Sequence, residues 1–298
     1  MTPEQYCEKK VKDSGSSFYY SFIFLNKIKQ REIFAIYAFC REVDDIADNI
    51  SDKSIAQIKL IWWVNDLQKC YTENQTPEHP VNQELKLVIN KYNLNKNIFE
   101  DLISGMQMDL DNTQYNTISE LLNYCYKVAG TVGLMCVNIF GYSDKSIFKY
   151  SESLSNFLHL VNITRDCKED YLKYNRIYIP KELLKKHNLS NQEFINILIK
   201  KDNIQKFKNL ILNLIDIAEN YYHLYKKQIS KKDLKSQFPG YIMGEIYKNI
   251  LDKIKKNPLL ILNEKKISVS PLKKLYIAWK TNRFIKKNYN NYLKSCTQ

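Results

Sequence analysis

The sequence predicts an all-α protein. Only 7 glycines and 7 prolines occur among 298 residues, so the tight turns that join neighbouring strands are scarce. Apolar residues make up 44% of the chain and recur at helical spacing through long segments. A chain of this length and composition can bury a large core, and we expect one domain covering residues 1–298.

Ten segments carry the apolar spacing of amphipathic helices. They cover approximately residues 17–49, 54–71, 82–92, 96–109, 118–140, 145–170, 191–198, 204–228, 241–256 and 271–292. The main breaks fall at 73–80, 111–116, 141–144, 171–180 and 257–270. None of these breaks is long enough to be a linker between domains, and no repeat of 20 to 50 residues is visible.

Cysteine usage and the chain start narrow the class of protein. The seven cysteines are scattered without a CxxC pair, which argues against a disulfide framework and against a zinc site. No apolar run reaches the roughly 18 residues needed to span a bilayer, and residues 1–7 do not resemble a signal peptide. We therefore expect a cytoplasmic protein with reduced cysteines.

The net charge of +13 is compatible with several anionic partners. No homeodomain, zinc-finger or RNA-binding signature accompanies it, so we expect no nucleic-acid partner. Basic residues interleave with large apolar ones near the C-terminus, which makes peripheral contact with the inner face of an anionic membrane a candidate role. A solvated helix face is the alternative. These basic residues are Lys253, Lys255, Lys256, Lys265, Lys266, Lys273, Lys274, Lys280, Arg283, Lys286 and Lys287.

Two short acidic clusters point to metal chemistry. Asp44 and Asp48 are four residues apart, as are Asp166 and Asp170, so each pair lies on one face of its predicted helix. Like charges at this spacing repel one another unless a cation lies between them. Hard oxygen ligands without nearby nitrogen or sulfur favour Mg²⁺. The two pairs together predict a magnesium site.

A single DxxxD pattern is weak evidence, because acidic residues often lie four apart on solvated helix faces. Two matched copies make that alternative less favourable. An apolar run at 34–39 precedes the first copy, and another at 157–163 precedes the second. Carboxylates within such core-forming helices are expected to point inward.

Several motifs together resemble the squalene and phytoene synthase family, the head-to-head prenyl transferases, over nearly the whole chain. They are SGSSFYYSF at 14–22, YAFCREVDDIAD at 37–48, YCYKVAGTVG at 124–133, NITRDCKED at 162–170 and RIYIP at 176–180. The resemblance implies a single-domain isoprenoid synthase helical bundle with a central cavity.

The implied reaction is the Mg²⁺-dependent condensation of two farnesyl diphosphates to presqualene diphosphate and pyrophosphate. The motif wording most resembles bacterial presqualene diphosphate synthases of the hopanoid pathway. A complete squalene or dehydrosqualene synthase and a phytoene synthase using geranylgeranyl diphosphate are the competing enzymes, and NADPH use stays open because reductive family members have no Rossmann domain. A non-catalytic scaffold of the same fold is the alternative from another class.

Ionising an allylic diphosphate requires stabilising a highly charged leaving group. We expect Asp44, Asp48, Asp166 and Asp170 to hold two or three Mg²⁺ ions. Four basic side chains are candidates to bind the diphosphate, with ordinary ion pairs to the aspartates as the alternative. They are Arg41, Arg165, Arg176 and one of Lys273 or Lys274.

The remaining candidates follow from residue type and from the resemblance. Ser14, Ser16 and Ser17 precede a helix and suit an anion, with a helix cap as the alternative. By the resemblance, Phe18 and Phe22 line the tunnel for the isoprenoid tail. Asn162 is a candidate to orient a ligand or the diphosphate, and three tyrosines are candidates to steer the carbocation through their ring electrons or hydroxyls. The tyrosines are Tyr37, Tyr124 and Tyr247.

Four positions depart from the family pattern. His159 stands where the family commonly has glutamine, and Asn175 stands where a glycine usually precedes Arg176. Thr164 and Cys167 replace frequent aliphatic residues. We assign no chemistry to His159, because a histidine on an apolar helix is more often a core residue.

Overall fold

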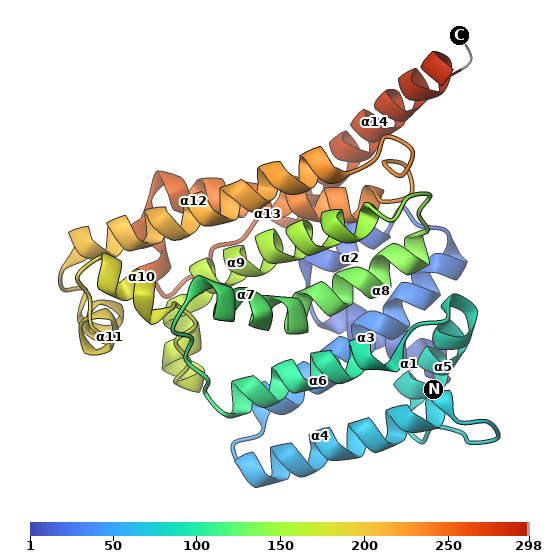
Figure 1. Cartoon of the computed structure of the whole chain (residues 1–298), viewed down its shortest axis with the longest axis horizontal. Coiled ribbons are helices and arrows are strands. Elements are labelled where there is room, and N and C mark those ends of the chain that lie inside the picture. Colours follow the sequence, from blue (N-terminus) through green and yellow to red (C-terminus); the bar gives the residue numbers. More distant parts are fainter. Residues whose placement is uncertain (297–298) are drawn as a thin grey trace.

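The computed structural model describes residues 1–296, which contain helices and loops but no strand (Figure 1). The predicted all-α class is confirmed; residues 297–298 of the expected domain lie outside the described part. No helix within residues 1–296 combines the length and apolarity needed to cross a membrane. The longer helices are α1 (Pro3–Asp13), α3 (Lys27–Asn49), α4 (Lys53–Gln68), α5 (Pro80–Tyr92), α6 (Lys96–Leu110), α7 (Ile118–Cys125), α8 (Thr131–Phe140), α9 (Ile147–Tyr174), α11 (Asn191–Lys200), α12 (Ile204–Gln228), α13 (Phe238–Lys256) and α14 (Pro271–Cys296).

The N-terminal part differs from the prediction. The expected helix over 17–49 is two helices, α2 (Ser17–Phe22) and α3, because the side chain of Asn26 accepts a hydrogen bond from the backbone N–H of Lys29 and starts a new helix. Helix α1 was not predicted, although Thr2 and Gln5 form a capping box around Pro3.

Other boundaries also shift. The expected helix over 118–140 contains one π-helical turn, η2 (Tyr126–Gly130), between α7 and α8. Helix α9 continues to Tyr174, and there Asn175 adopts a left-handed conformation with φ 54°. A short helix, α10 (Lys181–Lys186), follows Pro180 and was not predicted.

The helices pack around two apolar clusters. One cluster lies among α1, α3, α4, α5, α6 and α8, and the other lies among α7, α9, α11, α12 and α13. In Figure 1, α4, α6, α8, α9 and α12 follow one another across the molecule, each packed on the next. Phe18, Val128 and Phe238 contact both clusters. The boundary between the clusters therefore lies at the centre of the bundle.

Two glycines allow close helix contacts on the α9 side. A Cβ at Gly244 in α13 would clash with the hydroxyl of Tyr225 and lie 2.8 Å from its ring carbon Cζ. A Cβ at Gly133 in α8 would lie 2.6 Å from Ser151 Oγ in α9. A larger residue at either position would push neighbouring helices apart.

We expect Gly244→Ala to lower the free energy of unfolding by about 1–3 kcal/mol, because Tyr225 is fully buried and cannot move aside. Urea unfolding followed by circular dichroism measures this loss. Tyr225→Phe removes the clashing hydroxyl, which has no hydrogen-bond partner in the described structure, and should restore part of the loss in the double variant. Equal losses with and without the Tyr225 hydroxyl would contradict this packing explanation.

Candidate active site

Helix α3 presents one functional face to the boundary between the clusters. Tyr37, Arg41, Asp44 and Asp48 follow one another at spacings of four, three and four residues, which keeps them on one face. The opposite face of the helix is buried in the core through residues such as Phe39. The packing of α3 thereby fixes the direction of its carboxylates.

Helix α9 presents a matching face. His159, Asn162, Asp166 and Asp170 are spaced by three, four and four residues. Its other side packs along α12, with Phe157 fully buried. The two acidic clusters thus belong to two long helices from different parts of the bundle.

Two joined cavities lie between these helices. An apolar cavity of about 260 Å³ reaches into the bundle, and a polar cavity of about 560 Å³ opens beside it. Tyr37, Asp44, Tyr124 and Asn162 line both, so the cavities are continuous. The residues predicted for the site all line one or both cavities. These residues are Ser14, Ser16, Ser17, Phe18, Phe22, Tyr37, Arg41, Asp44, Asp48, Tyr124, Asn162, Arg165, Asp166, Asp170, Arg176 and Tyr247. Of the two candidate lysines, Lys274 lines the polar cavity and Lys273 lines neither.

Two half-buried carboxylates of the site resist ionisation. Burial, reinforced by the charge of Asp48, raises the pKa of Asp44 to about 7. Burial, reinforced by the charge of Asp166, raises the pKa of Asp170 to about 8. Both shifts show that further positive charge in the polar cavity would be favourable.

Arginines already compensate part of this negative charge. Arg41 pairs with Asp44 and, at 2.6 Å, with Asp45. Arg165 pairs with its neighbour Asp166, with Nε 2.7 Å from Oδ1. Arg176 also pairs with an aspartate, Asp48. All three arginines predicted to bind diphosphate therefore make ion pairs in this structure.

Arg176 links the C-terminal ends of α9 and α3. Its side chain is buried, with Nη1 2.7 Å from Asp48 Oδ1 and Nη2 2.8 Å from the carbonyl oxygen of Ala47. The left-handed turn at Asn175 ends α9 immediately before it. Asparagine tolerates this conformation better than most residues, so the replacement of the usual glycine is accommodated.

The serine segment forms the rim of the polar cavity beside Tyr37. Ser16 Oγ accepts a hydrogen bond from the backbone N–H of Phe18 and caps α2. Ser14 Oγ donates to the carbonyl oxygen of Val11 and accepts from the Tyr37 hydroxyl at 3.4 Å. Ser16 is therefore a helix cap, which was the alternative to anion binding. Ser14 instead connects the rim to α3 through Tyr37.

Aromatic rings form the start of the apolar cavity. The Phe18 ring centroid lies 5.6 Å from that of Tyr37 and 6.2 Å from that of Phe22. Phe22 in turn lies 6.5 Å from Phe140, another lining residue. This wall suits an apolar chain, because it offers mainly apolar surface and ring electrons, and the one hydroxyl among these rings, that of Tyr37, donates to Ser14 at the rim.

The sequence prediction missed Asp109. This buried carboxylate accepts hydrogen bonds from the hydroxyls of Tyr124 at 2.9 Å and Tyr178 at 2.7 Å, and burial raises its pKa to about 6. Asp109 follows Leu102 and Met106 at the spacing of one helix face. A carboxylate on the apolar face of a helix was the signal that would have found it.

His159 lines both cavities and contacts Tyr124, with ring centroids 5.5 Å apart. Burial lowers the pKa of His159 to about 4, which leaves the imidazole neutral at neutral pH. The other two departures are packing residues: Cys167 is buried, and the Thr164 hydroxyl donates to the carbonyl oxygen of Leu160.

The donor set of the polar cavity fits a hard cation. Within residues 1–296, no three His, Cys, Asp or Glu side chains gather closely enough to coordinate one ion by themselves. Carboxylates of both helices nevertheless line the same cavity, and the buried Asn162 Oδ1 has no hydrogen-bond partner in the described structure. An all-oxygen set with ligand positions left to phosphate oxygens is typical of Mg²⁺.

Known proteins are similar to this chain in sequence and in architecture. A 15-cis-phytoene synthase from Synechocystis sp. is 29% identical over 287 residues, covering 92% of this chain and 83% of that protein. The chain spans about 60% of the length of plant phytoene synthases such as that of an Oncidium hybrid cultivar, at 30% identity. A dehydrosqualene synthase crystal structure superposes with a TM-score of 0.81 at 27% identity, covering 96% of this chain and 97% of that one.

A squalene synthase structure from Alicyclobacillus acidocaldarius has the same fold, with a TM-score of 0.73 at 22% identity over 85% of this chain and 93% of that one. The sequence model of the squalene/phytoene synthase family matches residues 11–273, which include both aspartate pairs and the residues that join the two cavities. The chain belongs to the squalene/phytoene synthase family of prenyl transferases.

Proposed function

We propose that this enzyme condenses two farnesyl diphosphates head to head and forms presqualene diphosphate. The observation that carries this proposal is the pair of joined cavities. Carboxylates from α3 and α9 line the polar one, while aromatic and aliphatic side chains line the apolar one. Such a site accommodates a charged diphosphate and an apolar tail at the same time.

The polar cavity binds the diphosphates. Asp44, Asp48, Asp166 and Asp170 would hold Mg²⁺, which supplies positive charge that stabilises the departing diphosphate. Arg41 and Arg165 donate charge-assisted hydrogen bonds to phosphate oxygens when these compete with their present aspartate partners. Ser14 and Lys274 complete the rim, and Arg176 keeps Asp48 oriented.

The apolar cavity guides the carbocation. Cleavage of the C–O bond of one substrate releases pyrophosphate and leaves an allylic cation, which the double bond of the second substrate attacks. Ring closure with loss of a proton to the released pyrophosphate gives the cyclopropane product, which keeps the second diphosphate. The rings of Tyr37, Tyr124 and Tyr247 line the junction of the cavities and stabilise the cation by their electron density. A neutral His159 beside Tyr124 adds no repulsive charge.

The choice of farnesyl rather than geranylgeranyl diphosphate as the substrate follows from the motif wording. A phytoene synthase is the second candidate, because relatives at 28–30% identity carry that name. The resemblance to presqualene diphosphate synthases of the hopanoid pathway rests on the motifs alone.

We expect the purified protein to convert labelled farnesyl diphosphate to presqualene diphosphate in the presence of Mg²⁺, and to leave geranylgeranyl diphosphate largely unused. Parallel reactions with and without NADPH, resolved by chromatography, determine whether squalene is also made. Phytoene as the main product would identify the second candidate. No product from either substrate would favour a non-catalytic scaffold.

We expect Asp44→Asn or Asp166→Asn to reduce Mg²⁺-dependent turnover by at least about 100-fold, because each removes a carboxylate from the cation site. Asp216→Asn is the matched control. Asp216 is an exposed aspartate of α12 and does not line either cavity, so its replacement should change turnover little. Steady-state rates over a Mg²⁺ titration, with circular dichroism as the folding check, measure the difference; unchanged activity of both site variants would remove these aspartates from the site.

We expect the free energy of unfolding of the metal-free Asp109→Asn variant to increase, relative to that of the wild type, as the pH rises. The folded-state pKa of about 6 exceeds the ordinary value of 3.8, so the carboxyl stabilises the fold at low pH and loses this contribution as pH rises through 6. The relative gain should reach about 2 kcal/mol between about pH 4 and about pH 8. Urea unfolding at both pH values measures it.

Asp111→Asn is the control for this titration. Asp111 is exposed, and its hydrogen bond with Lys53 lowers its pKa, so this variant should lose stability relative to wild type as pH rises. The same pH trend in both variants would show that burial of Asp109 is not the cause.

A further inference from the structure

Helix α14 exposes large apolar side chains on its outer face. Leu272, Tyr276 and Trp279 are spaced by four and three residues, and 80%, 57% and 51% of their surfaces are exposed. The opposite face packs on the body through Ala278 and Ile285. In Figure 1 the C-terminal end of α14 extends beyond the rest of the bundle.

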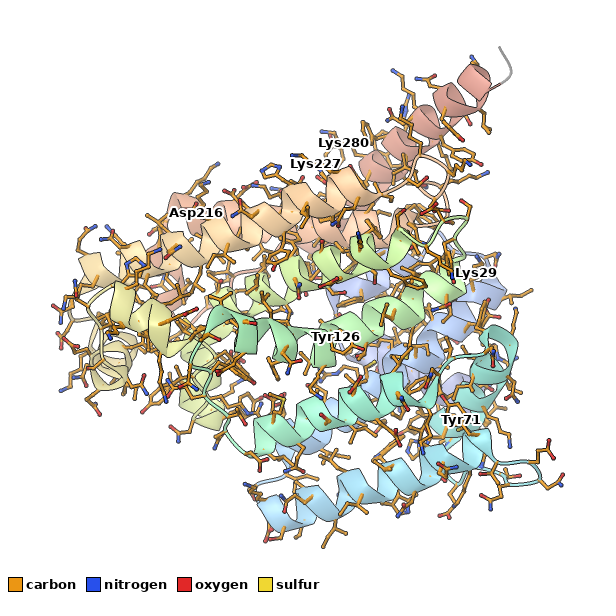
Figure 2. All side chains as sticks on the ribbon, viewed as in Figure 1. Lys29, Tyr71, Tyr126, Asp216, Lys227 and Lys280 are labelled. Atoms are coloured by element: carbon orange, nitrogen blue, oxygen red, sulfur yellow. The ribbon has the colours of Figure 1, made fainter. Side chains whose placement is uncertain are left out.

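The same helix is exclusively basic. Residues 271–296 contain six lysines and one arginine but no aspartate or glutamate. Arg283 follows Trp279 by one turn on the outer face, and its guanidinium lies 5.6 Å from the indole. Figure 2 shows Lys280 at the edge of the molecule. Within residues 1–294, no acidic side chain forms an ion pair with the exposed cations Lys273, Lys280, Arg283, Lys286 and Lys287.

The loop between α12 and α13 extends this basic surface. Lys231, Lys232 and Lys235 are exposed, and Lys235 Nζ lies 5.3 Å from the ring of Tyr289 in α14. Cations of two separate segments therefore flank α14. Exposed apolar side chains on a helix whose only charged residues are basic are typical of helices that lie in a membrane interface.

We propose that the outer face of α14 docks on an anionic lipid bilayer, with Leu272, Tyr276 and Trp279 inserted at the level of the headgroups. Aromatic side chains favour this depth, and the surrounding lysines and Arg283 attract anionic lipid. A second copy of this chain is a poorer partner. Two identical basic faces would repel each other in a symmetric dimer.

Docking at α14 would bring lipid close to the chain segment that borders the polar cavity. Ser268 and Val269 line that cavity immediately before α14 begins. Lys274, in the first turns of the helix, also lines it and lies 5.0 Å from the ring of Tyr20 in α2. This consequence rests on the proposed function, since prenyl diphosphates and their condensation products are lipids that partition into membranes.

Flotation of the full-length protein with vesicles tests the docking without any substrate. We expect binding to vesicles of phosphatidylcholine mixed with phosphatidylglycerol and little binding to pure phosphatidylcholine. Replacing Leu272, Tyr276 and Trp279 together by serine should weaken binding at least about tenfold. Raising the salt concentration should weaken it in the wild type as well.

A matched variant controls for the loss of exposed apolar surface. Ile55, Ile58 and Ile61 of α4 are 49%, 66% and 61% exposed, and their joint replacement by serine should leave vesicle binding unchanged. Three results would overturn the proposal: equal binding to neutral vesicles, binding that survives the α14 substitutions, or a dimer that forms in solution and disappears with them.

Turnover of farnesyl diphosphate in detergent separates this proposal from the proposed function. The α14 variant should keep wild-type turnover there, because its three substituted residues do not line either cavity. Absence of turnover in the wild type would count against the proposed reaction while leaving the vesicle result valid. Loss of turnover in the α14 variant alone would place these residues in the catalytic site and overturn their assignment to the membrane.

Discussion

The cost of keeping half-buried carboxylates ionised is the physical constraint on which the centre of this molecule depends. Asp44 and Asp170 lie in surroundings that raise their pKa values far above those of exposed aspartates. Ionised carboxylates in such surroundings are stable only near compensating charge. The arginines that pair with the aspartates provide part of it, and the remainder is available to a cation and its diphosphate ligands.

The bundle maintains this arrangement through its two apolar clusters. Helix α3 belongs to one cluster and α9 to the other, so each acidic face is held by a separate core. Arg176 connects them, since it follows α9 in the chain and pairs with Asp48 of α3. The two joined cavities lie between these helices.

Helical periodicity and motif spacing predict much of this structure from the sequence. Each aspartate pair could be placed on one helix face because its spacing matches the helical repeat, but the meeting of the two pairs at one cavity depends on how α3 and α9 pack. Helical spacing could also have marked Asp109 on the apolar face of α6, but not its hydrogen bonds, since its partners Tyr124 and Tyr178 lie outside α6. The split between α2 and α3 was also missed, because one capping side chain, Asn26, outweighs a continuous apolar pattern.

The strict spacing along α3 and α9 restricts the insertions and deletions that this protein can accept. One inserted or deleted residue between Tyr37 and Asp48 would turn everything beyond it by about 100° and direct one part of the face away from the cavity. Length changes should therefore be rejected inside these two helices and accepted in exposed loops such as residues 72–78. The helical repeat therefore limits which insertions and deletions this site can tolerate.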